Sequence, residues 1–170
     1  DEKENLIVAS FRQISRLTAV DLGTGTLLWN IGFDLPSGDC PMGDNLFSFQ
    51  HAPQILSNNR ILVFDNGNRR DHQTWQPSDP KAYSRAIELV LDDLRSPTQV
   101  KEGWSYQFGY CPSMGDADRL ENGTTLITAT RLNSIYEIGL NGTLKKSWNV
   151  NQIANCGSLG DPAYASERLP

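Results

Sequence analysis

The stretch FSFQHAPQILSNNRILVFDNGNRR, residues 47–70, contains two apolar runs separated by a turn. The first run directly follows His51, and Ser57-Asn58-Asn59 separates it from the second run, Arg60–Val63. Apolar runs bounded by Asn-rich turns are typical of β-strands. The stretch therefore predicts a β-hairpin with a histidine at its start, and with Asp65-Asn66-Gly67-Asn68 and two arginines at its end.

The strand pattern repeats along the chain. The second strand of the hairpin has counterparts near residues 6–9 and 125–128. Third strands are expected near residues 15–21, 84–91 and 134–140. Each fourth strand carries a tryptophan, at Trp29, Trp104 and Trp148. The last two are 148 − 104 = 44 residues apart, which matches a four-stranded propeller blade of roughly 40–50 residues.

The repeats predict an all-β fold, an incomplete β-propeller of about three to four four-stranded blades out of a probable six. We expect one domain, residues 1–170. Its blade segments are 1–46, 47–110 and 111–150, with a tail at 151–170. Because propellers need several blades to close, the remaining blades are expected from sequence outside this chain or from associated copies in a homo-oligomer. The tryptophans are expected in the core between blades.

Composition limits the classes of partner. The formal net charge is −5 and the pI is about 4.9, whereas a nucleic-acid-binding face is basic. We therefore expect no nucleic-acid partner, and any anion site must come from local clustering of arginines. No apolar run approaches the ~18 residues of a membrane span, and no signal peptide is recognisable.

Cysteines and sequons favour a secreted or periplasmic protein. Cys40, Cys111 and Cys156 form no C-x-x-C pair, which argues against zinc or dithiol chemistry. Their odd number permits one disulfide with a leftover thiol, or a bridge to sequence outside this chain. Asn122 and Asn141 each begin an Asn-Gly-Thr sequon. These are candidate glycosylation sites, although Asn-Gly is also a favoured hairpin turn.

The candidate chemistry is an anion site around His51. The residue begins a strand that is expected to line the propeller channel, and a structural histidine bonded to a neighbouring carbonyl is the alternative interpretation. Arg12, Arg85 and Arg131 lie near strand ends, so around a channel they would form an electropositive funnel for sulfate, phosphate or carboxylate.

A second histidine, His72, shares the polar loop 66–82 with Trp75. We expect it at the loop surface, with a lid residue as the alternative. The two histidines are 72 − 51 = 21 residues apart, without metal-ligand spacing. Neither a metal nor a cofactor is expected.

Five segments together resemble the arylsulfotransferase family, the nucleotide-independent type built as a six-bladed propeller. They are SFQHAP (48–53), RILVFDNGNRR (60–70), YSRAIEL (83–89), a W-x-Y-x-F-G segment (104–109) and GDADRLENGTTLITATRLNSIYEI (115–138). The resemblance implies that His51 is a nucleophile. It would take a sulfuryl group from an aryl sulfate, form a sulfohistidine and pass the group to a phenol.

The resemblance also implies roles for the other residues. Arg12 would contact the sulfuryl oxygens, although Phe11 is an alternative match for that position. Asn66 and Arg85 match family positions and would bind substrate or shape the site. Arg131 is a candidate substrate-binding residue through its place in the expected arginine funnel. The family takes further histidines and an asparagine from earlier blades, and the equivalent of His51 in the first blade falls upstream of Asp1. Whether this chain is active alone is therefore left open.

Two other functions remain as alternatives. The chain could be a secreted, non-catalytic propeller that serves as a scaffold or ligand-binding module. The segment DLGTGTLLW (21–29) also resembles the D-x-x-T-G-x-x-x-W turn of quinoprotein propellers. A quinone-dependent dehydrogenase fragment is less consistent with the sequence, because no paired acidic or metal-binding features accompany that turn.

Overall fold

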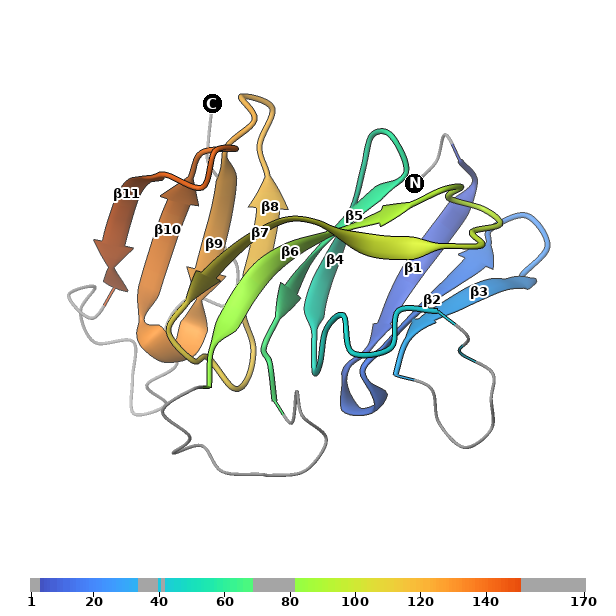
Figure 1. Cartoon of the computed structure of the whole chain (residues 1–170), viewed down its shortest axis with the longest axis horizontal. Helices are drawn as coiled ribbons and strands as arrows, with labels where there is room; N and C mark the ends of the chain where they lie inside the picture. Colours follow the sequence, from blue (N-terminus) through green and yellow to red (C-terminus); the bar gives the residue numbers. More distant parts are fainter. Residues whose placement is uncertain (1–3, 34–39, 41, 69–81, 151–170) are drawn as a thin grey trace.

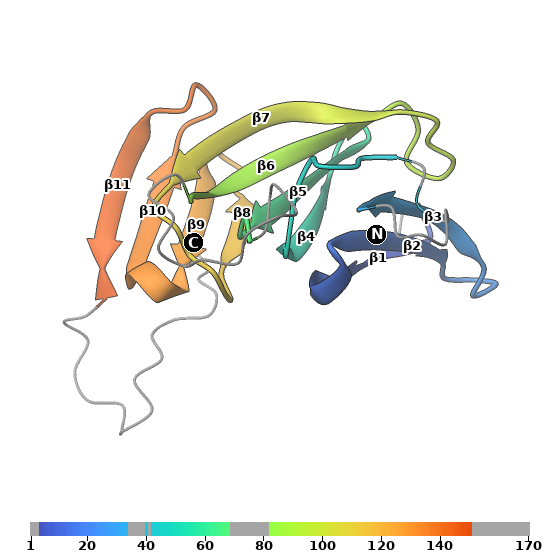
Figure 2. The ribbon, with the colours of Figure 1, turned by 60° about the horizontal axis from the view of Figure 1, so that its bottom comes forward.

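The computed structural model describes residues 4–33, 40, 42–68 and 82–150. Within them the chain is all-β and forms three antiparallel sheets, which confirms the predicted partial β-propeller. Figure 1 shows the sheets side by side, and Figure 2 shows the middle sheet lying between the other two. We call them blades 1, 2 and 3 in chain order.

Each blade is formed by consecutive strands that pair with their neighbours in sequence. Blade 1 contains β1 (Leu6–Phe11), β2 (Arg16–Asp21) and β3 (Leu27–Gly32). Blade 2 contains β4 (His51–Leu56), β5 (Arg60–Asp65), β6 (Ser84–Leu91) and β7 (Val100–Phe108). Blade 3 contains β8 (Asp116–Arg119), β9 (Thr125–Ala129), β10 (Ser134–Ile138) and β11 (Leu144–Asn149). Short 3₁₀ turns, η1 (Arg12–Ile14) and η2 (Thr130–Leu132), follow β1 and β9.

Strand β5 explains why the apolar run after the Asn-rich turn does not alternate with polar residues. Side chains alternate between the two faces of a strand, and here both faces are covered. Ile61 and Val63 pack into a core shared with blade 1. Leu62 and Phe64 pack into a second core shared with blade 3. Burial on both sides therefore selects apolar residues at four consecutive positions.

The prediction for the tryptophans is confirmed for the first of them and wrong for the last. Trp29 is buried, and its indole N–H donates to the carbonyl of Leu94 in blade 2 at 2.8 Å. Trp104 is half-buried and packs against the core between blades 2 and 3. Trp148 is 43% exposed. All three tryptophans lie in the last strand of a sheet, but Trp29 and Trp104 are contacted by the following blade, whereas no further sheet follows blade 3 among the described residues and all six residues of β11 are exposed.

The three blades share a common polarity. The turns β4–β5, β8–β9 and β10–β11 lie at one end of the sheets, at the top of Figure 1, and η1 and η2 lie at the other end. The first strands β4 and β8 contact each other, and β4 also contacts β1. His51 begins β4 and is therefore at the η1 and η2 end.

Neither described cysteine forms a disulfide in this structure. Cys40 and Cys111 are both buried, and each thiol lies near a backbone carbonyl. Cys156 lies outside the described residues. In the described part of the chain, no helix combines the length and the apolar character needed to cross a membrane.

Replacing a buried isoleucine of β5 should destabilise the protein much more than the same change in β1. Ile61 is completely buried, whereas Ile7 is 50% exposed. We expect Ile61→Ala to lower the free energy of unfolding by about 2–5 kcal/mol, and Ile7→Ala by about 0.5 kcal/mol. Urea unfolding followed by circular dichroism measures both. Equal losses would contradict the assignment of β5 to the core.

Candidate functional site

The backbone around His51 departs from a regular strand. A β-bulge interrupts the pairing of β4 with β5 between His51 and Gln54. Phe49 and Ala52 have φ angles of 54° and 50°, which non-glycine residues seldom adopt. Bulges occur often next to functional sites, where they redirect a side chain, and such backbone strain persists only where surrounding contacts hold it.

Those contacts come from blade 1. The side-chain amide of Gln50 is completely buried and donates to Ser10 Oγ and to the carbonyl of Arg16, each at 2.9 Å. The backbone N–H of Phe49 donates to Ser15 Oγ at 3.0 Å. The two residues before His51 are therefore tied to the neighbouring sheet, which fixes where β4 begins.

Asn66 determines which nitrogen of His51 carries the proton. Its Nδ2 donates to the carbonyls of Cys111 and Met114, at 2.7 and 2.9 Å. Because the amide nitrogen is held by two acceptors, Oδ1 is the atom that faces the imidazole, 2.6 Å from His51 Nδ1. An amide oxygen can only accept, so Nδ1 carries the proton. In neutral His51 the other nitrogen, Nε2, then has a free lone pair.

The segment 111–114 links the three blades at this end. Ser84 Oγ accepts from the N–H of Cys111 at 2.8 Å and donates to the carbonyl of Asn66 at 2.8 Å. Asn68 Nδ2 and Arg12 Nη2 each donate to the carbonyl of Pro112 at 2.8 Å. The predicted residues Arg12 and Asn66, which come from different blades, therefore both donate to the segment 111–114.

A buried carboxylate secures the ends of the β4–β5 hairpin. Asp65 is completely buried and accepts at Oδ1 from the N–H groups of Ser48 and Gly67, both at 3.0 Å. Its Oδ2 accepts from Arg85 Nε at 3.0 Å. Ser48 precedes His51 and Gly67 follows Asn66, so one side chain positions both members of the histidine–amide pair.

Arg12 is the arginine whose charge acts on the His51 imidazole. Its guanidinium carbon lies 4.9 Å from the centre of the Phe49 ring, and its charge contributes to the environment of the imidazole. Nε of Arg12 is buried without a hydrogen-bond partner, and no described carboxylate forms an ion pair with this side chain. Phe11, the alternative match, belongs to β1 and is 49% exposed.

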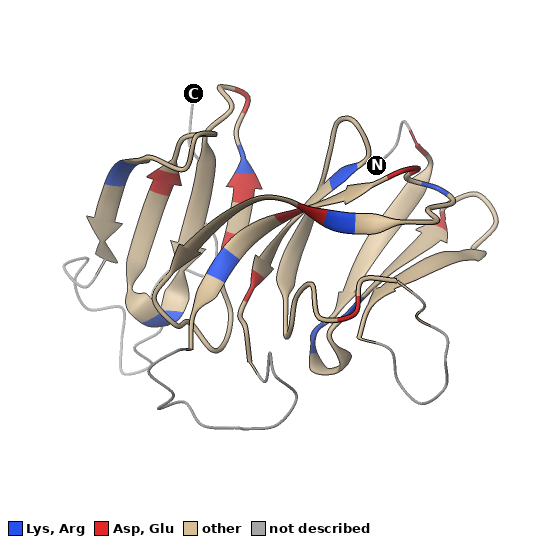
Figure 3. Ribbon diagram, in the orientation of Figure 1, with Lys and Arg blue, Asp and Glu red and all other residues tan. Residues whose placement is uncertain are grey.

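The other two predicted arginines do not join Arg12 in a ring of unpaired charges. Arg85 is bound to Asp65, to Glu102 at 2.9 Å and to the carbonyl of Leu46 at 2.7 Å. Arg131 is exposed and donates from Nε to Ser113 Oγ at 2.9 Å. Figure 3 shows acidic and basic residues interspersed over the sheets. Of the three predicted arginines, Arg85 is thus neutralised by carboxylates, whereas Arg12 donates to an uncharged carbonyl and Arg131 to an uncharged hydroxyl.

The remaining predicted residues are separate from this cluster. Asn122 and Asn141 are exposed in turns at the opposite end of blade 3. Each side-chain oxygen accepts from the threonine hydroxyl of its sequon, at 2.8 and 2.7 Å. His72 and Trp75 lie outside the described residues.

Sequence reasoning missed Asp65 and Ser84 as supports of the site. A signal for Asp65 was present. Asp65 ends β5, Arg85 lies in β6, and the two strands pair so that these residues face each other. Opposite charges at a cross-strand position are a recognisable pair. Nothing comparable in the sequence indicates that Ser84 contacts Cys111.

The surroundings of His51 keep the imidazole neutral. Burial lowers its pKa, the hydrogen bond to Asn66 raises it, and the nearby charge of Arg12 lowers it again, with a net decrease. The folded protein therefore gains stability from neutral His51 that is fully present above the ordinary pKa of about 6.5. That gain is lost as the pH falls through the lower folded-state pKa.

Comparison with known proteins gives a family match and matches among solved structures. The family model described as arylsulfotransferase (ASST) matches residues 1–155. No curated protein matches the chain. A solved structure that matches is a protein of unknown function from Bacteroides caccae, a crystal structure at 1.35 Å resolution, with 12% identity and a TM-score of 0.37. The match covers 86% of this chain and 58% of that chain, so this chain spans under two thirds of that protein's length.

The pKa of His51 should respond in opposite directions to changes at its two neighbours. Arg12→Gln removes a positive charge and should raise the pKa, whereas Asn66→Leu removes the bond that favours the charged form and should lower it. NMR titration of the imidazole proton resonances measures both, with His51→Asn for assignment. Arg95→Gln, which breaks the distant ion pair with Asp21, is the control. A lower pKa in Arg12→Gln would refute the electrostatic account.

Proposed function

Because this chain belongs to the arylsulfotransferase family, we propose that His51 carries a sulfuryl group from an aryl sulfate to a phenol. The observation that supports this role best is the contact between His51 Nδ1 and Asn66 Oδ1 at 2.6 Å. It places the proton on Nδ1 and leaves the Nε2 lone pair available, which is the form that a nucleophilic histidine requires.

In the proposed first step, His51 Nε2 attacks the sulfur of the aryl sulfate. The N–S bond forms while the bond from sulfur to the aryl oxygen breaks, and the phenolate leaves. The imidazole becomes positively charged because Nδ1 keeps its proton. Asn66 Oδ1 accepts from that N–H throughout, and charge on the donor strengthens such a hydrogen bond.

In the second step, the oxygen of an acceptor phenol attacks the same sulfur. The N–S bond breaks, its electron pair returns to Nε2, and the phenolic proton is released to a base or to solvent. His51 is then neutral again with the proton on Nδ1. The low pKa of His51 favours this neutral form at the start of each cycle.

Arg12 is proposed to offset the charge on the sulfuryl oxygens. The transferring group carries negative charge on its non-bridging oxygens, and guanidinium donors stabilise such charge in group transfer. Arg12 has unused donor capacity at Nε. Asn66 is proposed to orient His51, while Arg85 maintains the site through Asp65 and does not contact substrate. Arg131 is proposed to bind the substrate outside the His51–Asn66 pair.

A non-catalytic secreted propeller is the second candidate. It is favoured by the contacts of the predicted funnel, because Arg85 is neutralised by two carboxylates and Arg131 is bonded to Ser113. In that case Arg12 and His51 would bind an anion without transferring it. Detection of a covalent sulfohistidine separates the two candidates.

The cellular location and the glycosylation of the protein are also proposals. We propose that it is secreted or periplasmic, and that Asn122 and Asn141 carry glycans if it passes through a eukaryotic secretory pathway. Their exposure at the end opposite His51 supports this, because attached glycans would leave the site open. The remaining blades are proposed to come from additional sequence or from further copies of the chain.

The complete protein should release nitrophenol from 4-nitrophenyl sulfate in the presence of a phenol, and His51→Ala should abolish release. During turnover with a poor acceptor, peptide mass spectrometry at neutral or basic pH should find one added SO₃ group on His51. Arg95→Gln, distant from the site, should retain full activity. Release that continues in His51→Ala, or the absence of release from the complete protein, would refute the catalytic role.

Asn66→Leu should lower kcat by about a hundredfold, because the imidazole loses its fixed orientation and protonation. KM should change little if Asn66 does not contact the substrate. Asn68→Leu is a matched control, since Asn68 likewise donates to the segment 111–114, at the carbonyl of Pro112, but forms no hydrogen bond with His51. Equal losses of kcat in the two variants would show that loop integrity, and not the tautomer, limits the rate.

A further inference from the structure

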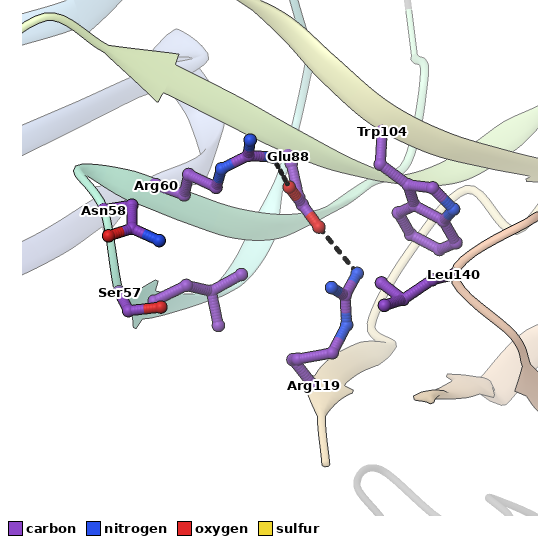
Figure 4. Close-up of a pocket in the computed structure, with 8 residues that line it drawn as sticks. Ser57, Asn58, Arg60, Glu88, Trp104, Arg119 and Leu140 are labelled. Carbon is purple, nitrogen blue, oxygen red and sulfur yellow. Dashed lines mark hydrogen bonds and ion pairs between the residues drawn. The ribbon is translucent and has the colours of Figure 1, made fainter. Parts of the chain in front are cut away.

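A polar cavity lies at the end of the sheets opposite His51. It has a volume of about 460 Å³ and opens between blades 2 and 3. Figure 4 shows the residues around it, which come from the end of β4, the β4–β5 turn, β5, β6, β7, β8 and the β10–β11 turn. The polar and aromatic members are Ser57, Asn58, Arg60, Glu88, Trp104 and Arg119. His51 and Leu56 begin and end the same strand, so this cavity is separate from the His51 site.

The charges that line the cavity do not balance. Glu88 is 2% exposed and lies between two guanidinium groups, 2.7 Å from Arg60 Nη1 and 2.7 Å from Arg119 Nη2. The contact with Arg119 is an ion pair whose geometry does not meet that of a hydrogen bond. One carboxylate therefore faces two cations, which leaves a net charge of about +1 in a chain that is acidic as a whole.

Arg119 is fixed by its contacts, and one of its guanidinium nitrogens forms no hydrogen bond or ion pair with another described residue. Its Nε donates to Thr125 Oγ1 at 2.9 Å, and its guanidinium carbon lies 5.0 Å from the centre of a Trp104 ring. Its side chain is 15% exposed. Figure 4 shows the remaining guanidinium nitrogen directed toward the side of the cavity that carries Ser57 and Asn58. A fixed guanidinium loses little conformational entropy when it binds an anion.

The opposite wall adds neutral polar groups. Ser57 and Asn58 are exposed in the β4–β5 turn, and their side chains form no hydrogen bond with another described residue. Figure 4 shows the amide nitrogen of Asn58 facing the cavity. Leu56 and Leu140 supply apolar surface between the polar groups. The cavity thus combines a cationic end, a neutral polar end and an apolar surface.

We propose that this cavity binds a small organic molecule that carries one monoanionic oxyanion group, a carboxylate or a sulfate ester. The oxyanion contacts Arg119 and Arg60, where it neutralises the excess charge, and the organic body lies against Leu56, Leu140 and the edge of Trp104. Planar guanidinium groups match planar carboxylates by paired hydrogen bonds. Because the net charge of the cavity is about +1, we expect it to bind a monoanion in preference to a dianion such as phosphate. The proposal does not depend on sulfuryl transfer at His51.

Binding of benzoate and phenyl sulfate tests the proposal and distinguishes the two kinds of oxyanion. Isothermal titration calorimetry at constant ionic strength should show saturable binding of at least one probe, in the millimolar range or tighter. The indole N–H resonance of Trp104, assigned with Trp104→Phe, should shift on binding. Benzyl alcohol, a neutral analogue, should not bind.

Two variants connect that binding to the cavity without breaking the contacts between blades. Arg60→Gln removes the more exposed guanidinium and should weaken binding about tenfold. Asn58→Asp places a negative charge on the wall and should weaken it at least as much, while aspartate tolerates the φ of 60° found there. Arg95→Gln, which changes an arginine outside the cavity, should leave binding of benzoate unchanged. Lack of saturable binding of both probes, or binding that Arg60→Gln and Asn58→Asp do not affect, would overturn the proposal.

Discussion

The arrangement of the His51 site depends on the buried carboxylate of Asp65. A buried, ionised carboxylate is stable only when it is paired and hydrogen-bonded. Asp65 satisfies this condition with Arg85 from the neighbouring strand and with two backbone N–H groups. These N–H groups belong to the segments on either side of the β4–β5 hairpin. The same interaction that neutralises the carboxylate therefore closes the base of the hairpin, where His51 and Asn66 meet.

The blades are joined at this end by a second set of contacts, which are hydrogen bonds to uncharged backbone carbonyls. The segment 111–114 presents backbone carbonyls to Asn66, Asn68 and Arg12. Backbone acceptors are fixed by the chain and carry no charge, so they orient donors without neutralising Arg12. This leaves the guanidinium of Arg12 with an uncompensated charge beside a neutral imidazole. An arginine held by carboxylates, as Arg85 is, would have been positioned equally well but would have less attraction for an anion.

Much of the architecture could be predicted from the sequence, because each blade repeats the same order of strands and turns. The position of His51 at the start of a strand followed from the apolar run after it. The details of the site could not be predicted in the same way. The left-handed backbone of Phe49 and Ala52 could not be predicted because neither residue is a glycine. The contacts that hold Phe49 and Gln50 are made with Ser15, Ser10 and Arg16 of another blade. The partners of Asn66 lie 45 and 48 residues away, beyond the reach of local patterns. Arg85 was expected to act on an anion, and the signal against this was its cross-strand position opposite Asp65.

The common polarity of the blades has a practical consequence for handling the protein. The loops that assemble the His51 site are all at one end, whereas the Asn141-Gly142 turn at the other end is exposed and its glycine has open space around it. An affinity tag inserted at that turn, or attachment of the turn to a solid support, would orient the His51 end toward the bulk solution. Soluble reactants would then reach the histidine without passing the surface that holds the protein.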